Sequence, residues 1–370
     1  MISRRSLLRT TSAALAASLL PSRARAASRL VSLPPIDVRK ERVLKTIVGL
    51  RPFRPSGYVV RADKLGEKLV VHHYGHGGCG VTLSWGTAEL AVRLVEQAGR
   101  TDAQKRVAVI GCGAVGLATA RLLQQAGYRP TLYARDLPPD TLSNVAGARW
   151  YPFDVFDRKV VSSAFLDELW RVSRVAYRVF TKLGPDYGVR RYRSYACRNS
   201  PFPTESLLHM DSPIHDLLPG MRDLSVEENP LKYSLVRTFE TLFIEPHVYL
   251  PRVIADFKQA GGTIVVRDFA DAAALATLPE PTLVNCTGMG ASKLFADAEL
   301  MPIKGQLSIL PPQADIDYIT LPPDIYMFPR SDGIILGGTF QRGVYTMEPD
   351  RAAEERVLRK HQEFFRSIRR

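Results

Sequence analysis

Apolar and polar residues first alternate in a regular way from residue 106 onward. Residues 106–110 are a short β-branched run typical of a buried strand, and residues 117–126 carry apolar side chains at helical spacing up to Gly127. A second apolar run at residues 130–134 predicts another strand. Strand, helix and strand in this order predict a βαβ unit with a parallel sheet.

Other segments extend this sheet or pack on it. Apolar residues at helical spacing predict a core helix over 165–183 and a helix over 249–260 that two glycines end. Strands predicted at 263–267 and 282–285 continue the same sheet. A last helix is predicted over 352–368.

The turn after the first strand, residues 111–116, reads Gly-Cys-Gly-Ala-Val-Gly, a G-x-G-x-x-G motif. Glycines let the backbone turn tightly and approach a pyrophosphate, whose charge is stabilised by free N–H groups at a helix N-terminus. We therefore predict dinucleotide binding, with a close-packed structural turn as the alternative. Arg135 stands where a ribose-binding acid is expected and Asp136 follows it, so which side chain meets the adenosine half stays open.

A second glycine-dense segment, residues 74–86, comes earlier in the chain and leads into a predicted helix at 87–98. This density indicates backbone pressed against something flat or bulky, although glycines also mark ordinary turns. Upstream, residues 51–55 read Arg-Pro-Phe-Arg-Pro, with prolines stiffening the chain around two guanidinium groups. His76 has no carboxylate or nucleophile beside it in the motif, so we expect a structural or cofactor-contact role and not that of a general base.

The N-terminus predicts export. Residues 3–8 contain a twin arginine, residues 10–20 a short, weakly apolar stretch, and residues 24–26 a small-x-small cleavage site. The apolar stretch is shorter than the ~20 residues that span a bilayer, so we expect no stable membrane span, with an uncleaved interfacial anchor as the alternative. A twin-arginine signal at residues 1–26 predicts a periplasmic or secreted protein.

Composition and charge narrow the function classes. The chain has 370 residues, 45% apolar and 24% charged, which is typical of a soluble globular protein of about two domains. The formal net charge is +13, and residues 1–26 hold five arginines and no acid, so the remainder would carry +8. The basic residues are scattered and are not interleaved with stacking aromatics, so we predict no nucleic-acid partner.

The cysteines and the known catalytic motifs exclude further classes. Cys79, Cys112, Cys197 and Cys286 lack C-x-x-C or Cys/His spacing, so we predict free thiols packed as small apolar residues and no metal site. The sequence contains no G-x-S-x-G or H-E-x-x-H motif, which argues against hydrolases.

Seven segments, in order along the chain, resemble the D-amino-acid oxidase family of FAD flavoenzymes. They are residues 107–116, 134–140, 145–150, 284–288, 305–306, 326–329 and 336–340. The family carries its R-P-x-R-P and Y-G-H-G-G segments at the C-terminal end, whereas here they are residues 51–55 and 74–86. We therefore predict a circular permutation, with the old termini joined through residues 99–102 and a new break between the last helix and a strand at 43–50.

The resemblance implies the fold class and the domains. We expect an α/β chain with a Rossmann-like FAD-binding domain on a parallel sheet and a substrate domain on a mixed, largely antiparallel sheet. The implied boundaries are 1–26 for the signal, 27–68 for a permuted segment of the substrate domain, 69–155 with 245–300 for the FAD-binding domain, and 156–244 with 301–370 for the substrate domain.

The resemblance also implies the site. Arg51 would bind the substrate carboxylate together with the hydroxyl of Tyr326, and the backbone carbonyl of Gly78 would accept a hydrogen bond from the substrate amine. Arg54 is expected to be structural, and Pro322 replaces a second family tyrosine of the active-site lid. We expect no residue to act as a catalytic acid or base. The expected FAD contacts are Gly75, His76, Gly77, Gly80, Thr82, Gly111, Gly113, Ala114, Val115, Gly116, Arg135, Asp136, Ser143, Asn144, Ala146, Gly147, Arg149, Trp150 and Gly288.

The implied activity is oxidation of D-amino acids by hydride transfer from Cα to FAD, giving 2-oxo acids, ammonia and, with molecular oxygen, hydrogen peroxide. Phe340 stands where acid-specific relatives are expected to carry an arginine, so we expect neutral side chains, with Arg342 as a reservation. Alternatives are a D-aspartate oxidase, a related flavin amine oxidase or dehydrogenase with another acceptor, and a non-catalytic flavin-binding protein. Expected partners are a small-molecule D-amino acid and oxygen, and the oligomeric state stays open, a homodimer included.

Overall fold

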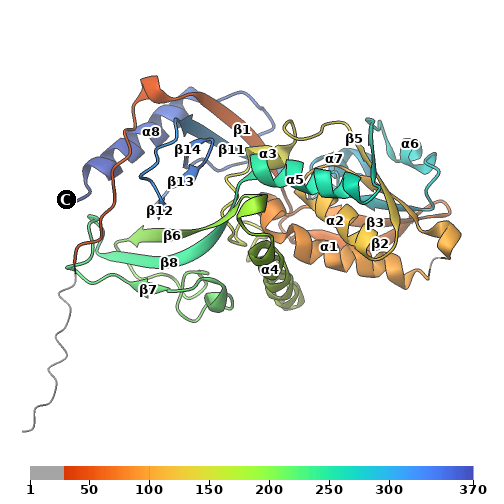
Figure 1. Cartoon of the computed structure of the whole chain (residues 1–370), viewed down its shortest axis with the longest axis horizontal. Helices are drawn as coiled ribbons and strands as arrows, with labels where there is room; N and C mark the ends of the chain where they lie inside the picture. Colours follow the sequence, from red (N-terminus) through yellow and green to blue (C-terminus); the bar gives the residue numbers. More distant parts are fainter. Residues whose placement is uncertain (1–28, 100, 370) are drawn as a thin grey trace, which may run out of the picture.

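The computed structural model describes residues 29–99 and 101–369, with two β-sheets at opposite ends of the molecule (Figure 1). One sheet has six strands in the order β2-β3-β10-β4-β5-β9. They are β2 (Val59–Leu65), β3 (Lys68–Tyr74), β10 (Thr282–Asn285), β4 (Arg106–Ile110), β5 (Arg129–Ala134) and β9 (Thr263–Val266). The strands from β3 to β9 are parallel, and β2 pairs antiparallel with β3 at the edge.

Helices pack on the six-stranded sheet and complete its core. The predicted βαβ unit is present as β4, α2 (Ala114–Gln125) and β5, and the last four residues of β4 are buried. Helix α1 (Gly80–Gln97) packs against α2 and α4 (Ser163–Leu183), and α5 (Pro246–Gln259) packs against α2. Shorter helices are α3 (Leu142–Val145), α6 (Ala272–Ala276) and α7 (Gly290–Leu294).

The second sheet is mixed and largely antiparallel. Its order is β1-β11-β14-β13-β12-β6-β8-β7, and β15 pairs with β11. These strands are β1 (Lys45–Phe53), β11 (Met301–Leu310), β14 (Gly333–Gly337), β13 (Tyr326–Arg330), β12 (Tyr318–Leu321), β6 (Val189–Arg198), β8 (Leu235–Ile244), β7 (Arg222–Asp223) and β15 (Gln341–Arg342). Helix α8 (Arg351–Arg366) packs on β11 and β14. The predicted fold class, a parallel sheet plus a mixed one, is confirmed.

Helix α1 begins earlier than its pattern predicted. It starts at Gly80 and contains Gly86, whereas the sequence predicted a glycine-dense turn up to residue 86. A Cβ on Gly86 would lie 2.0 Å from the carbonyl oxygen of Val172 in α4. This glycine therefore allows two helices to approach closely, a contact that the local sequence does not encode.

The N-terminal segment contributes strands to both sheets. Strand β1 pairs with β11 in the nine-stranded sheet, and β2 joins the six-stranded sheet through a hairpin with β3. The turn of this hairpin contains Gly66 at φ +58°, a left-handed conformation that favours glycine. The predicted boundary at residue 68 therefore falls inside a hairpin, and the segment 27–68 does not lie wholly with the substrate sheet.

The two ends of the described chain lie on one loop. The backbone N–H of Val31 donates to the carbonyl of Glu228 at 2.9 Å, and that of Arg369 donates to the carbonyl of Pro230 at 2.8 Å. The predicted twin-arginine signal, residues 1–26, lies outside the described residues. None of the described helices is long and apolar enough to cross a membrane.

Candidate active site

A cavity of about 1480 Å³ lies between the two sheets. Its lining comes from β1, the β3–α1 turn, the β4–α2 loop, the end of β5 and β13. The volume exceeds the roughly 300–1,000 Å³ of ordinary small-molecule sites, so the cavity has room for a dinucleotide and a substrate together. It also lies at the carboxyl ends of parallel strands, where α/β sheets bind such ligands.

The β4–α2 loop has the geometry that its glycine motif requires. Gly111 has φ +112°, and a Cβ there would lie 2.4 Å from the carbonyl oxygen of Cys286. A Cβ on Gly116 would lie 1.9 Å from the carbonyl oxygen of Gly111, so this glycine closes the turn against the helix. Ser143 Oγ accepts the Ala114 N–H at 3.0 Å, at the first turn of α2. The turn fits a pyrophosphate that approaches its backbone.

At the end of β5, Arg135 and Asp136 both line the cavity. They form an ion pair at 2.7 Å between Nη2 and Oδ2, and this hydrogen bond raises the pKa of Arg135. The pair lies where the adenosine half of a dinucleotide is expected.

The β3–α1 turn supplies a second glycine cradle to the cavity. Gly75 and Gly77 both have positive φ, and a Cβ on Gly77 would lie 2.1 Å from the carbonyl oxygen of Asp154. The ring of His76 stacks on Tyr58 at 5.1 Å between centroids and shares a hydrogen bond of 3.0 Å with Thr87 Oγ1. Burial lowers the pKa of His76 to about 3, so its ring is neutral and held in place.

Arg51 of β1 extends into the cavity between two glycines. Added Cβ atoms would lie 2.7 Å from its Nη2 at Gly305 and 3.4 Å from its Cδ at Gly78. Among the described residues, no carboxylate oxygen lies within 4.0 Å of the Arg51 guanidinium. Burial raises the pKa of Tyr326, and the charge and hydrogen bond of Arg51 oppose that rise. Arg51 and Tyr326 are therefore neighbours, as predicted.

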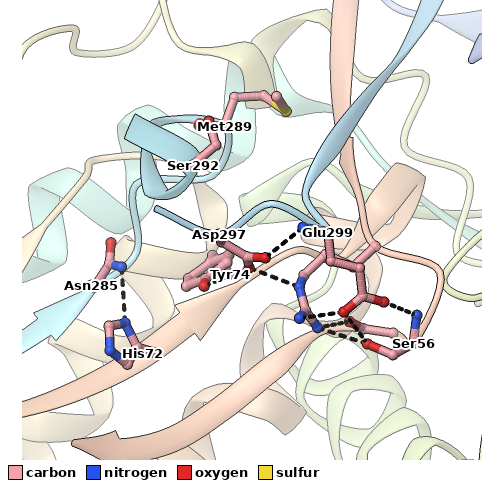
Figure 2. A network of polar contacts seen from close by, with 10 residues as sticks. Ser56, His72, Tyr74, Asn285, Met289, Ser292, Asp297 and Glu299 are labelled. Atoms are coloured by element: carbon pink, nitrogen blue, oxygen red, sulfur yellow. Dashed lines mark hydrogen bonds and ion pairs between the residues drawn. The ribbon is translucent and has the colours of Figure 1, made fainter. Parts of the chain in front are cut away.

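Arg54 has a different environment. Its Nε donates to Asp297 at 2.9 Å and its Nη2 to Glu299 at 2.6 Å, and its Nη1 bonds Ser56. Figure 2 shows these carboxylates, with Tyr74 donating to Asp297 and Ser56 donating to Glu299. Arg54 does not line the main cavity, which supports the structural role expected for it.

The structure brings most of the predicted contacts to the cavity, and three of them lie outside its lining. Gly116 packs against the glycine loop, as described above. The Asn144 side chain accepts a hydrogen bond from Thr141 at 2.8 Å. Trp150 is fully buried against Tyr177, at 4.9 Å between ring centroids. Trp150 is thus a core residue, because its ring points away from the cavity into α4.

Asp154 also lines the cavity, although no motif in the sequence pointed to it. Burial raises its pKa to about 6, and the charges of Arg51 and Arg342 oppose the rise. Asp154 adopts φ +55°, which no local sequence signal indicated. Arg342 interacts with other groups. Its Nη1 pairs with Asp157 Oδ2 at 3.3 Å, and its guanidinium carbon lies 4.7 Å from the ring centroid of Phe53.

The cysteines are free and buried, as predicted. Cys79 Sγ donates to the carbonyl of Phe153 at 2.8 Å, and burial raises the pKa of this thiol to about 12. It therefore ties the segment before Asp154 to the start of α1.

Comparisons with known proteins agree with this geometry. A family model described as "DAO: FAD dependent oxidoreductase" matches residues 106–370. D-amino-acid oxidase of Rubrobacter xylanophilus is 30% identical over 261 residues, covering 69% of this chain and 76% of the relative. D-aspartate oxidase of Homo sapiens is 25% identical over 264 residues, covering 68% and 74%. Glycine oxidase from Geobacillus kaustophilus, a solved structure, superposes with a TM-score of 0.56 at 14% identity, covering 71% of this chain and 80% of that one.

Proposed function

The chain belongs to the DAO family of FAD-dependent oxidoreductases, and from this premise we propose that its substrates are D-amino acids and its electron acceptor is molecular oxygen. The observation that carries the proposal is Arg51, which lies in the cavity beside Tyr326 and is paired with no described carboxylate. A guanidinium in this state is suited to bind the carboxylate of an amino acid through two parallel hydrogen bonds.

The site residues would position the substrate by its two backbone groups. Arg51 and the Tyr326 hydroxyl would hold the α-carboxylate, and the carbonyl of Gly78 would accept a hydrogen bond from the amine. These contacts fix the orientation of Cα and thereby select one stereoisomer. When bound, FAD would accept the hydride from Cα, and the imino acid product would be hydrolysed by water to a 2-oxo acid and ammonia.

The buried histidines favour a reaction without a protein base. His73 and His76 line the cavity, and burial lowers the pKa of each. Both share hydrogen bonds with Thr87 Oγ1. Their rings are held inside the fold, so we assign them to the shape of the cofactor cradle.

The test is an anaerobic titration of the protein purified from residue 27 onward. We expect a flavin absorption band that D-alanine bleaches and L-alanine does not, and peroxide once oxygen is admitted. Bleaching by the L-isomer, or by neither, would overturn the substrate assignment, and bleaching without peroxide would overturn the acceptor.

We also infer that the chain is circularly permuted relative to its family. Three observations support this: the family model begins at β4, the preceding segment supplies β1 and β3, and the described chain ends meet on the loop at 228–230. A chain rearranged to run from 101 to 369, through a short linker, to 29–99 should fold and bind FAD. A matched rearrangement opened within β4 should not fold. Failure of the first chain would contradict the permutation.

Export by the twin-arginine route is proposed on the sequence pattern alone. Its test is the mass of the protein recovered from the periplasm or medium, which should correspond to cleavage after Ala26.

A further inference from the structure

Arg149 lines the cavity without an ion pair to a described carboxylate, as do Arg51, Arg198 and Arg267. It follows α3 and forms an isolated bridge with Phe243 of β8, so its backbone is held against the nine-stranded sheet. Its side chain lines the cavity, and its guanidinium stacks on the ring of Tyr151 at 4.2 Å. Its Nη1 is buried and has no hydrogen-bond partner.

Such an arrangement is costly unless an anion completes it. Among the described residues, no carboxylate oxygen lies within 4.0 Å of Arg149. Burial lowers its pKa to about 10, which still leaves the guanidinium protonated at neutral pH. A buried cation with an unsatisfied N–H destabilises a fold by several kcal/mol in general. The site is therefore preorganised for a negatively charged group from outside the chain.

Arg149 lies at the substrate end of the cavity. The groups that influence its pKa include Tyr151, Cys79 and Tyr326, and Tyr326 is also the neighbour of Arg51. Tyr151 and Tyr326 lie outside the glycine turns that are expected to hold the dinucleotide, and Cys79 lies in the β3–α1 turn next to Gly78, the residue expected to bind the substrate amine. The charges of both Arg51 and Arg149 act on the Tyr326 hydroxyl, and Arg51 alone accounts for one carboxylate.

The charges of this end of the cavity match a dicarboxylic substrate. Of the charged groups that act on Tyr326, Arg51 and Arg149 contribute two positive charges and Asp154 contributes one negative charge. A D-amino acid with an acidic side chain brings two carboxylates and one ammonium group. The two carboxylates then match the two guanidinium groups and the ammonium group matches Asp154, whereas a neutral amino acid leaves one buried cation uncompensated.

We propose that Arg149 binds the side-chain carboxylate of the substrate, so that the protein acts on acidic D-amino acids of the glutamate and aspartate type. This rests on the proposed function and replaces the neutral side chain expected from Phe340. The ring of Phe340 lies 5.8 Å from the Arg51 guanidinium and Arg342 is paired with Asp157, and neither residue belongs to the cavity lining that contains Arg149.

The test compares each acid with its amide, which has nearly the same shape and lacks the charge. We expect kcat/KM for D-glutamate to exceed that for D-glutamine, or D-aspartate that for D-asparagine, by at least about tenfold, as for one charge-assisted hydrogen-bonded pair. Arg149→Met should bring the ratio close to one. Arg267→Met is the matched control and should keep the ratio, because Arg267 also lines the cavity and stacks on an aromatic ring, that of Phe269, but lies beside the end of β5, where its backbone N–H donates to the carbonyl of Ala134.

Taking a ratio within each variant cancels general losses of fold or cofactor, and the flavin spectrum reports loading. If Arg149→Met does not fold, Arg149→Lys is the second variant. It keeps the positive charge but lacks the planar guanidinium, so it should retain a reduced preference for the acid over the amide. A ratio of one in the wild type, with D-glutamine still oxidised, overturns this inference and leaves the proposed function intact. No flavin reduction by any D-amino acid overturns the proposed function itself. A ratio that survives Arg149→Met places the carboxylate site elsewhere.

Discussion

Arg51 and Arg54 belong to one Arg-Pro-Phe-Arg-Pro segment, yet they lie in opposite electrostatic environments. Arg54 is bound by Asp297 and Glu299, and its side chain is 14% exposed. Arg51 lies in the cavity beside Tyr326, with no described carboxylate in ion-pair distance. A guanidinium whose charge is already matched stabilises the fold, whereas an unmatched one is available to a ligand. The neighbours, and not the residue type, thus determine each role.

The largest expected effect is that of Arg51→Leu. Truncating one partner of a buried charge pair costs about 2–5 kcal/mol, so kcat/KM for D-amino acids should fall at least about 30-fold, mainly through KM. The flavin spectrum should be retained, and the melting temperature should not fall, because an unmatched cation is removed. Steady-state kinetics and thermal unfolding measure both. An unchanged KM would move the α-carboxylate site away from Arg51.

Arg54→Leu should give the opposite result. It leaves Asp297 and Glu299 without their cation in a partly buried network, which should lower the free energy of unfolding by about 2 kcal/mol. Chemical denaturation measures the loss, and Arg54→Lys should recover part of it. KM should change less than in Arg51→Leu. Equal effects of the two substitutions on KM would erase the distinction between the arginines.

Local patterns could predict the elements but not these environments. The β4–α2–β5 unit follows the predicted bounds closely, because apolar periodicity and a glycine motif specify it within one short stretch. The start of α1 was predicted too late because the glycine at position 86 is required by the close contact with Val172 of α4. Val172 lies far along the chain, so no local pattern shows this contact. In the same way, Trp150 lies in the core because Tyr177 of α4 meets it there.

The candidate site was predictable as a set of family-like segments. Which of its arginines are paired with a carboxylate could not be predicted, because the pairing depends on segments that lie far apart in the sequence. The partners of Arg54 are Asp297 and Glu299. The groups that influence the pKa of Arg149 include Cys79 and Tyr326, which are also distant from it in the sequence. The resemblance could therefore assign Arg51 to a ligand but gave no reason to separate Arg149 from the other expected FAD contacts.

Tyr326→Phe should have a smaller effect than either arginine substitution. It removes one hydroxyl contact with the substrate carboxylate and keeps the ring that lies against Gly337. We expect KM to rise about tenfold, as for one hydrogen bond to a charged group, with the flavin spectrum unchanged. No change in KM would reduce Tyr326 to a packing residue and leave the carboxylate to Arg51 alone.

The smallest effect concerns two carboxylates, Asp297, which pairs with Arg54, and Asp154, whose pKa the charge of Arg51 influences. Burial raises the pKa of Asp297, but the hydrogen bond from Tyr74 and the charge of Arg54 lower it further, so the pKa lies below its ordinary value of 3.8. Its stabilising contribution is complete above pH 3.8 and is lost as the pH falls through the lowered pKa. Asp297→Asn should therefore cost stability at pH 7 and progressively less below pH 3.8.

Asp154 should behave in the opposite way, because burial raises its pKa to about 6. The folded protein then holds a proton between pH 3.8 and 6 that the unfolded chain releases, so the carboxylate lowers stability as the pH rises through this window. Relative to the wild type, Asp154→Asn should gain on the order of 1 kcal/mol of stability between pH 4 and pH 7. Urea unfolding across this range measures both variants. If the two stability differences changed with pH in the same direction, Asp154 would be a paired carboxylate like Asp297, and the electrostatic contrast between the cavity and the Arg54 network would fail.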